Sequence, residues 1–468
     1  MVDTESEGRR ERRRVGREIR KSLPRESLGL WEPPADRRDP VEILIQQSAS
    51  RVSELVGVRY ARMLSSEFAF FRGAAAVMAS DLSYSPQTHL TVQLAGDAHL
   101  LNFGGYASPE RDFVFDINDF DETLPGPFEW DLKRLVASCA VAGRTNGLDE
   151  AARARLVREV VETYRGSVQQ FAQMARLDVW YAILTAQDIE AHWTAGADKK
   201  HRKAFRKHVA KSVMRTSERA LQKLTTTDAD GRIRFNSKPP FLEPFEQVVP
   251  ADEREEIVQA ALVSLVDYRR TLLSDRRVLF SGYRVVDVAR KVVGVGSVGT
   301  RCWVVLLMAD KDESDVLMLQ FKEAQASALE PYLGSSRVPS HGQRVVEGQR
   351  LMQTVSDILL GWTQLQVRGQ QVDFYVRQMW DWKESVDVAS MVEATLDVYA
   401  RECGWTLARA HSRSGDRVAL AAYLGSGDAL DNAMVQFAEA YAEQNAKDFA
   451  ALQEAASAGR IEVAASGW

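Results

Sequence analysis

The pattern of apolar and polar positions predicts a chain that is mostly helical towards both ends. Between residue 41 and about residue 82, apolar side chains recur at the three-to-four-residue spacing of a helix face, among them Leu44, Val52 and Leu55. The same spacing predicts further helices over residues 131–143, 149–176, 343–360, 388–411 and 429–457.

Apolar runs bounded by turn residues predict strands in two parts of the chain. Residues 90–95 and 112–118 form the first part, and we expect them to pair as a hairpin whose loop carries His99 and Asn102. The sequence changes character near residue 278, where runs rich in Val, Leu and Ile predict consecutive antiparallel strands. These runs cover residues 284–293, 301–309 and 315–321, and a later one covers residues 372–379. Together with the helices, they predict an α+β fold.

The composition is that of an ordinary globular protein. The 468 residues, 45% of them hydrophobic and 27% charged, are enough for two or more domains. No apolar run is long enough to cross a bilayer, and none follows the Arg-rich start as in a signal peptide, so we expect no membrane partner. The net charge of −5 argues against nucleic acid as a partner. Cys139, Cys302 and Cys403 form neither a zinc pattern nor a disulfide framework, which indicates a cytoplasmic protein.

Two segments contain clusters of basic residues. Residues 1–40 carry many arginines and end in several prolines, and we expect a flexible tail there; docking to an acidic surface or to nucleic acid is the alternative. Residues 177–250 are polar and predict a mostly helical insertion with a basic run from Lys199 to Lys211. A solvated helix face explains this run, and contact with the phosphates of a substrate is the alternative.

Residues 96–131 hold the richest candidate chemistry. Asp97, Asn102 and Asp119 follow the order and spacing that phosphoryl-transfer enzymes of the kinase type use for a base and two metal ligands. Magnesium prefers hard oxygen ligands, which Asn102 and Asp119 supply, with Asp121 as a further possibility. His99 is a candidate to orient the loop or to donate to a phosphate.

Other interpretations of this acidic stretch stay open. A structural or calcium-type acidic loop is one of them. A metal hydrolase is another, but a single histidine is a poor set of ligands for zinc. The residues that such a hydrolase would use are Asp97, His99, Asp116, Asp119 and Asp121.

A glycine-rich segment and a lysine form a second candidate site. Gly294, Gly296 and Gly299 join two predicted strands, which suits a flap over ATP phosphates better than a dinucleotide-binding turn. Lys322 ends the next strand, where a kinase keeps its phosphate-contacting lysine. We expect Glu347 on the following helix to hold it, with Glu323 and Glu330 as competitors. The strand 372–379, followed by residues 380–383, is the expected hinge beside an adenine.

The motifs resemble known families. Gly-Asp-x-His-x-x-Asn, Asp-Phe-Asp-Glu and Gly-Pro-x-x-x-Asp-Leu resemble the active site of aminoglycoside and choline phosphotransferases, in the protein-kinase-like superfamily. This resemblance implies a catalytic role for Asp97, metal binding by Asn102 and Asp119, and a buried Asp131 that braces the catalytic loop. After residue 20, the whole chain resembles the bacterial family catalogued as domain of unknown function 2252, which supplies no established reaction.

The order of the motifs departs from that of kinases, in which the flap and lysine precede the catalytic loop. Asp416 follows a helix that resembles the one leading into that loop, but Ala421 stands where a metal-binding Asn is needed, so Asp97 is the better catalytic residue. Circular permutation of a two-lobed kinase-like fold explains this order. The expected parts are a tail (1–40), a helix-rich catalytic lobe (41–277), an antiparallel nucleotide-binding lobe (278–385) and helices that complete the catalytic lobe (386–468).

These features lead to one principal expectation and two alternatives. The principal one is a phosphotransferase that uses ATP and Mg²⁺ and acts on a small-molecule hydroxyl, with Arg72 as an additional contact to phosphate or substrate. A non-catalytic nucleotide-binding regulatory protein is the first alternative. Nucleotidyl transfer on the same scaffold is the second.

Overall fold

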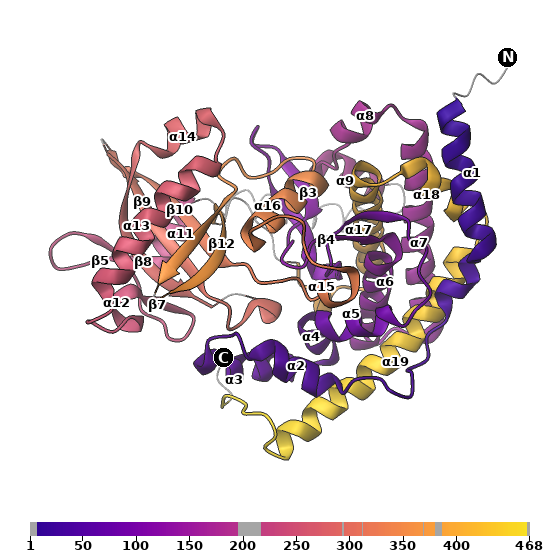
Figure 1. The fold of residues 1–468 in the computed structure, drawn as a ribbon, viewed down its shortest axis with the longest axis horizontal. Helices are drawn as coiled ribbons and strands as arrows, with labels where there is room; N and C mark the ends of the chain where they lie inside the picture. The colour runs from indigo at the N-terminus through magenta and orange to yellow at the C-terminus, as the bar shows by residue number, and fades with distance from the viewer. Residues whose placement is uncertain are drawn as a thin grey trace.

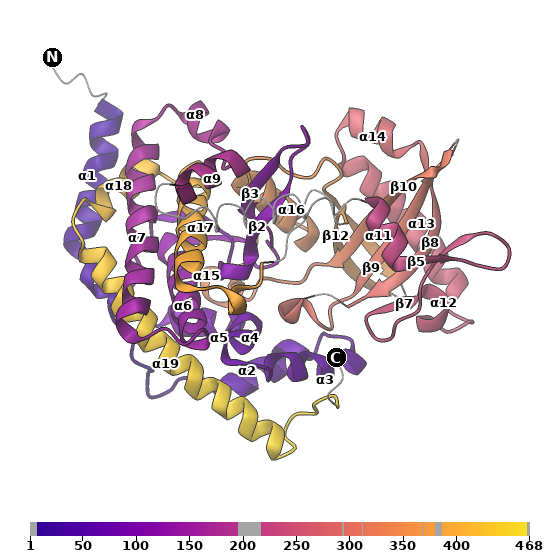
Figure 2. The ribbon, with the colours of Figure 1, turned by 180° about the vertical axis from the view of Figure 1, so that it is seen from behind.

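The computed structural model describes residues 7–194, 217–292, 294–310, 312–367, 369–379 and 386–465. A helix-rich part and a part built on an antiparallel sheet lie side by side (Figures 1 and 2). The α+β class expected from the sequence is therefore confirmed. Among the described residues, no helix is both long enough and apolar enough to cross a membrane. The basic run from Lys199 to Lys211 and the hinge residues 380–383 lie outside the described ranges.

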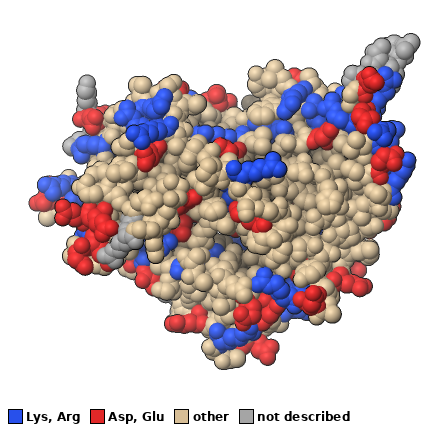
Figure 3. Space-filling view, in the orientation of Figure 1, with Lys and Arg blue, Asp and Glu red and all other residues tan. Residues whose placement is uncertain are grey.

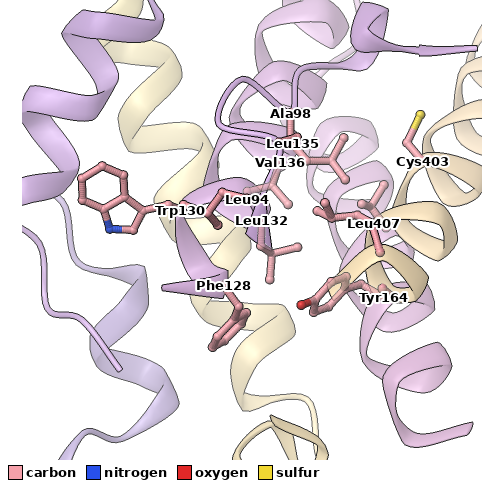
Figure 4. Close-up of a cluster of buried hydrophobic side chains, with 14 of the residues drawn as sticks. Leu94, Ala98, Phe128, Trp130, Leu132, Leu135, Val136, Tyr164, Cys403 and Leu407 are labelled. Carbon is pink, nitrogen blue, oxygen red and sulfur yellow. The ribbon is translucent and has the colours of Figure 1, made fainter. Parts of the chain in front are cut away.

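The helix-rich part is organised around α6 (Phe128–Thr145), whose residues from 128 to 143 are all buried. Side chains of α6 meet those of α7 (Glu150–Gln173) and α17 (Glu393–Ser414) in the main hydrophobic core (Figure 4). Burial of each large apolar side chain in such a core stabilises the fold by about 1.5–3 kcal/mol. The core therefore fixes the helix that carries Asp131.

Shorter helices and one long helix surround this core. The long helix α19 (Ala429–Ser457) runs along the edge of the helix-rich part, from α1 towards α3 (Figure 1). The other helices of this part are α1 (Glu7–Ser22), η1 (Arg25–Gly29), α2 (Pro40–Ser48), α3 (Ser53–Met63), α4 (Glu67–Gly73), α5 (Ala75–Ser83), η2 (Leu100–Asn102), α8 (Arg176–Tyr181), α9 (Ala186–Thr194), η4 (Val388–Ser390) and α18 (Arg417–Leu424).

The sheet part contains six antiparallel strands in the order β11-β12-β10-β9-β8-β7. The three consecutive strands expected after residue 278 are present as β8, β9 and β10. The strands are β7 (Leu242–Pro244), β8 (Tyr283–Lys291), β9 (Cys302–Ala309), β10 (Asp312–Glu323), β11 (Gly361–Val367) and β12 (Gln370–Gln378). The remaining elements near the sheet are α11 (Ser217–Leu224), β5 (Thr225–Thr227), β6 (Ile233–Phe235), α12 (Phe245–Val248), α13 (Arg254–Thr271), α14 (Ser274–Phe280), η3 (Val295–Ser297), α15 (Glu330–Leu333) and α16 (His341–Met352).

The sheet part begins well before residue 278. Tyr268 of α13 and Phe280 of α14 belong to a hydrophobic cluster with residues of β9 and β10. Leu224, Phe235 and Leu242 pack on residues of β8, β9 and β10 in a second cluster. The insertion expected to be mostly helical therefore supplies a strand and a hairpin to this part. Its strands are too short, at three residues each, to give a clear alternating pattern in the sequence.

The basic N-terminal region also differs from the flexible tail that we expected, because residues 7–22 form the helix α1. This helix packs closely on α18 at Gly16, where a Cβ atom would lie 2.0 Å from the carbonyl oxygen of Ala419. The helix thus has one face that fits α18 and another that presents arginines. Its high arginine content concealed the packing face in the sequence.

The pairing of the short strands around the catalytic motif is a second difference. The expected strands are present as β1 (Thr91–Leu94) and β3 (Phe113–Ile117), but they do not pair with each other. Instead β1 pairs with β4 (Leu124–Pro127), and β3 pairs with β2 (Phe103–Ala107). Since β4 contains two prolines and a glycine, its sequence gives no strand signal.

Candidate active site

The catalytic motif begins where β1 ends, and Asp131 fixes this turn. Both oxygens of the buried Asp131 carboxylate accept backbone N–H groups, from Ala95 at 2.7 Å and from Gly96 at 2.9 Å. His411 lies next to this carboxylate, with Nε2 3.2 Å from an oxygen. Gly96 has a φ of +84°, and a Cβ atom there would lie 2.2 Å from the carbonyl oxygen of Glu122, so only glycine fits. Asp131 therefore holds the turn at Ala95 and Gly96, at the position where the resemblance implied a bracing aspartate.

Asp97 is held by an arginine that the sequence analysis did not identify. Arg134 Nε lies 2.8 Å from a carboxylate oxygen of Asp97, while another nitrogen of the guanidinium donates to the Phe71 carbonyl at 2.7 Å. The guanidinium also lies 3.8 Å from the centre of the Phe71 ring. Arg134 follows Asp131 by three residues, so both lie on one face of α6. That spacing was the signal available in the sequence.

His99 and Asn102 complete the catalytic loop. His99 Nε2 lies 3.7 Å from the other carboxylate oxygen of Asp97. Burial lowers the pKa of His99 to about 4, against a smaller opposing effect of Asp97, so the imidazole is neutral near pH 7. Asn102 donates from its side chain to the carbonyl of Asp97 at 2.7 Å, and its amide oxygen is the atom available to a ligand.

Lys322 reaches the acidic residues of the motif across the boundary between the two parts. Its Nζ lies 2.5 Å from Asp121 Oδ2 and 3.6 Å from Asp119 Oδ2. Burial alone would lower the pKa of Lys322, but the two carboxylates raise it well above its ordinary value. Asp121 also accepts hydrogen bonds from Tyr375 at 2.8 Å and from Ser297 at 3.1 Å. Asp121 is thus the most connected carboxylate of the site.

Glu347 does not hold Lys322. It lies on the exposed face of α16 and accepts a hydrogen bond from Gln343, one turn earlier. The buried face of α16 carries Arg344 instead, whose guanidinium donates to the carbonyls of Asp121 and Thr123 at 2.8 and 2.7 Å. The helix therefore supports the acidic loop through an arginine. The competitors Glu323 and Glu330 bind Arg301 and the Ser327 amide, respectively.

The glycine-rich segment approaches the catalytic motif from the sheet part. It forms the short helix η3 between β8 and β9, and Gly294 and Gly296 line the same cavity as Asp97. Gly299 has a φ of +91°, and its carbonyl accepts the N–H of Val52 at 2.8 Å. The segment is thus fastened to the helix-rich part at Gly299 and faces the cavity at Gly294 and Gly296.

One cavity of about 370 Å³, called here the central cavity, brings both groups of predicted residues together. Its charged and polar lining comes from Gln47, Arg72, Asp97, His99, Asn102, Asn118, Asp119, Asp121, Glu122, Ser297, Gln320, Lys322 and Arg377. A larger outer cavity of about 1100 Å³ adjoins it and shares Asp121, Glu122, Gly296 and Ser297 with it. Residues 323–326 and the first residues of β12 line this outer cavity.

Arg72 brings a further positive charge to the central cavity. Its buried Nε has no hydrogen-bond partner within the described residues. Burial lowers the pKa of Arg72, and the nearby charge of Asp97 opposes this effect. A half-buried guanidinium whose Nε lacks a partner is suited to hold an anionic group of a ligand.

The oxygen donors fit a divalent cation only in combination with a ligand. Across the described ranges, no group of three or more His, Cys, Asp and Glu side chains is arranged to hold a metal ion. Asn102, Asp119 and Asp121 nevertheless line one cavity with oxygen atoms. Magnesium is typically bound in this way, by one or two carboxylates together with phosphate and water.

Asp416, the rival to Asp97, has a structural role. Its carboxylate accepts the N–H groups of Val418 and Ala419 at 3.0 and 3.1 Å and so caps α18. It does not line the central cavity.

Comparison with known proteins identifies a family. No curated protein and no solved structure was found to match the chain. A family model described as "Uncharacterized protein conserved in bacteria (DUF2252)" matches residues 51–455, which include every residue of the candidate active site. The chain therefore belongs to the DUF2252 family.

Proposed function

We propose that the protein is a phosphotransferase that uses ATP and Mg²⁺ and acts on the hydroxyl group of a small molecule. The observation that carries this proposal is the shared cavity: Lys322 and the glycine-rich segment face Asp97 and Asp119 across one space. The two groups of residues are more than 170 positions apart in the sequence. Their convergence on a phosphate-binding arrangement supports a single active site.

Asp97 is the residue that positions the acceptor hydroxyl and takes its proton. One carboxylate oxygen of Asp97 forms the ion pair with Arg134, and the other lies near His99 at the central cavity. The neutral His99 is suited to donate or accept a hydrogen bond without adding charge. A phosphotransferase accelerates its reaction mainly by positioning the reactants and stabilising charge, because phosphoryl transfer requires little covalent chemistry from the protein.

Lys322, Arg72 and the glycine-rich segment neutralise and cradle the phosphates in this proposal. Lys322 exchanges its contact with Asp121 for one with a phosphate oxygen, while Gly294 and Gly296 allow backbone amides to approach closely. Asn102 and Asp119 hold Mg²⁺, which neutralises phosphate charge when it is bound. The outer cavity, next to Val372 and Ala324, receives the nucleoside.

The same residues support a kinase-like fold with a permuted order. The strand β10, which carries Lys322, the helix α16 after it and the strand β12 correspond to a nucleotide lobe, and they follow the catalytic loop in the chain. Arg344 ties α16 to the acidic loop, which fits a nucleotide lobe docked on a catalytic lobe.

The test is turnover of ATP by the wild-type protein and by Asp97→Asn, with a panel of hydroxyl acceptors and with water as the default acceptor. We expect the substitution to lower turnover by at least about 100-fold, the usual contribution of a positioned base, and to leave ATP binding measured by calorimetry within about threefold. The matched control is Asp416→Asn. Asn is an equally good helix cap, so this variant is expected to keep both its fold and its activity.

The position of the label decides between the alternatives. ATP labelled at the γ-phosphate is expected to label the product. Retention of α-phosphate label on the product would instead indicate nucleotidyl transfer. Binding of ATP with no turnover on any acceptor would indicate a non-catalytic regulatory protein, and equal activity of Asp97→Asn and wild type would refute the role of Asp97.

A further inference from the structure

A second cavity, which shares no lining residue with the central cavity, has four arginines among its seven lining residues. It has a volume of about 480 Å³ and lies where α1, α8, α17 and α18 meet. Each of these elements contributes one guanidinium or the residues beside it: Arg12, Arg176, Arg413 and Arg417, together with Ser414, Gly415 and Asp416. None of these residues lines the central cavity. We call this space the arginine cavity.

The arginines of this cavity form no ion pairs with the described residues, although the charges of Asp416 and Asp116 act on Arg417 and Arg413 from nearby. Within the described ranges, no carboxylate forms an ion pair with Arg12, Arg176, Arg413 or Arg417. The one acidic residue in the lining, Asp416, directs its Oδ1 to the N-terminus of α18. This concentration of positive charge stands in a chain whose net charge is −5. Figure 3 shows Lys and Arg side chains gathered on the same side of the molecule, near α1 and α8.

Arg413 adds a fixed, buried guanidinium to this cavity. Its side chain is 6% exposed and stacks on the ring of Trp180 at 4.3 Å, which holds the guanidinium in place. Its buried Nε has no hydrogen-bond partner among the described residues. Buried polar groups in folded proteins are normally satisfied, and an exception indicates an absent partner.

Arg417 shows the effect of the crowded charges. Burial lowers its pKa, and Arg12, Arg176 and Arg9 lower it further, because each positive neighbour disfavours another positive charge. Two of its nitrogens donate to the carbonyls of Phe171 and Met174, so the side chain is fixed rather than free to move away. An anion in the cavity would relieve this repulsion.

We propose that the arginine cavity binds a small phosphate-bearing ligand, at a site separate from the candidate active site. Guanidinium groups bind phosphate oxygens through paired hydrogen bonds, and four of them around one space suit an anion with more than one negative charge. The volume is larger than an orthophosphate needs and admits a pyrophosphate or a phosphorylated metabolite. This proposal does not rest on the proposed function.

The floor of the arginine cavity is joined to the strand that leads to Asp97. Ser414 accepts the N–H of Gln93 in β1 at 3.0 Å, and a Cβ atom at Gly415 would lie 3.0 Å from the carbonyl oxygen of Thr91. From Gln93 the chain runs directly to Ala95 and Gly96, which Asp131 holds. A ligand in the cavity would therefore order the C-terminal end of α17 beside the base of the catalytic loop.

The test is calorimetric titration of the full chain with inorganic pyrophosphate at constant ionic strength. We expect the double variant Arg12→Gln, Arg176→Gln to bind at least tenfold more weakly than wild type. The matched control is the double variant Arg10→Gln, Arg269→Gln, which also removes two positive charges, from exposed positions outside the cavity, and is expected to bind within twofold of wild type. Equal melting temperatures verify that the variants are folded.

Two further arms locate the bound anion. The same titration of Lys322→Met is expected to retain the binding that the double variant loses; loss in Lys322→Met alone would place the pyrophosphate in the central cavity and overturn the proposal. Single-stranded DNA and anionic lipid vesicles form the last arm. Binding of either one, with no binding of pyrophosphate, would also overturn it and point to an extended basic surface that includes the neighbouring Arg9, Arg13, Arg17 and Arg20.

Discussion

The brace at Asp131 allows a sharp prediction, because its two carboxylate oxygens face two hydrogen-bond donors of the backbone. In Asp131→Asn, one oxygen is replaced by an NH₂ group, while the N–H groups of Ala95 and Gly96 both need an acceptor. In either orientation of the amide, one N–H faces another donor. We expect this variant to lose a large part of the stability of the catalytic loop.

The magnitude follows from the two effects. A hydrogen bond to a charged acceptor contributes about 1.5–3 kcal/mol, and a buried N–H left without a partner costs about 1–3 kcal/mol. The two overlap, since the stranded N–H is the one whose bond is lost, so the free energy of unfolding should fall by about 2–4 kcal/mol. The assay is urea denaturation followed by tryptophan fluorescence.

Glu129→Gln is the matched control for this prediction. Glu129 lies on the same helix, is equally buried, and accepts the N–H and the hydroxyl of Thr88 at 2.6 and 2.8 Å. The Thr88 hydroxyl can accept as well as donate, so Gln finds two partners and the loss should stay below about 1.5 kcal/mol. Equal losses in the two variants would refute the reasoning, because they would show that the charge matters and the donor geometry does not.

Two other features give independent predictions. Gly96→Ala should lower the free energy of unfolding by about 2–5 kcal/mol, because the positive φ and the contact with Glu122 both oppose a Cβ atom. Gly147→Ala should lower it by about 1–2 kcal/mol, because Gly147 also has a positive φ, of +77°, but has open space around it. Thermal or urea unfolding of both variants measures the difference. Buried His99 has a pKa of about 4 in the folded state and an ordinary value near 6.5 when unfolded, so the unfolded chain binds a proton first as the pH falls. The free energy of unfolding should therefore decrease as the pH falls from about 6.5 to 4, by up to about 3 kcal/mol from this group. Urea titrations of His99→Gln across that range should show a smaller decrease than those of wild type. Parallel stability curves for the two proteins would contradict the burial of a neutral imidazole.

Much of the fold could be predicted from the sequence because its elements have strong local periodicity. The helix over 429–457 and the strands around Lys322 appear close to the expected positions. Strand pairing could not be predicted in the same way. The partner of β1 is the segment Leu124–Pro127, where Pro and Gly suppress the usual strand signal. Residues of both strands pack with α6 in the main core, which is a long-range contact.

In the candidate site, too, residues in short motifs could be predicted from the sequence, whereas contacts between distant segments could not. Asp97, Asn102, Asp119 and Lys322 were identified because their chemistry is tied to short motifs, and the fold brings them to one cavity. The partners of Asp97 and Lys322 were not identified correctly. Glu347 faces solvent because the phase of α16 turns Arg344 inwards, and a shift of one residue on a helix rotates a side chain by about 100°.

The contact between Lys322 and Asp121 has a consequence for selectivity among ligands. Lys322 serves as the counter-ion of Asp119 and Asp121, so its positive charge is already paired within the protein before any anion binds. If an anionic ligand binds Lys322, the carboxylates of Asp119 and Asp121 lose their counter-ion and face the negative charge of the ligand. A phosphate that arrives together with a divalent cation restores the balance on both sides. The cavity therefore selects for the charge of the whole complex, and a bare polyphosphate should be rejected by the same residues that bind it when it is accompanied by a cation.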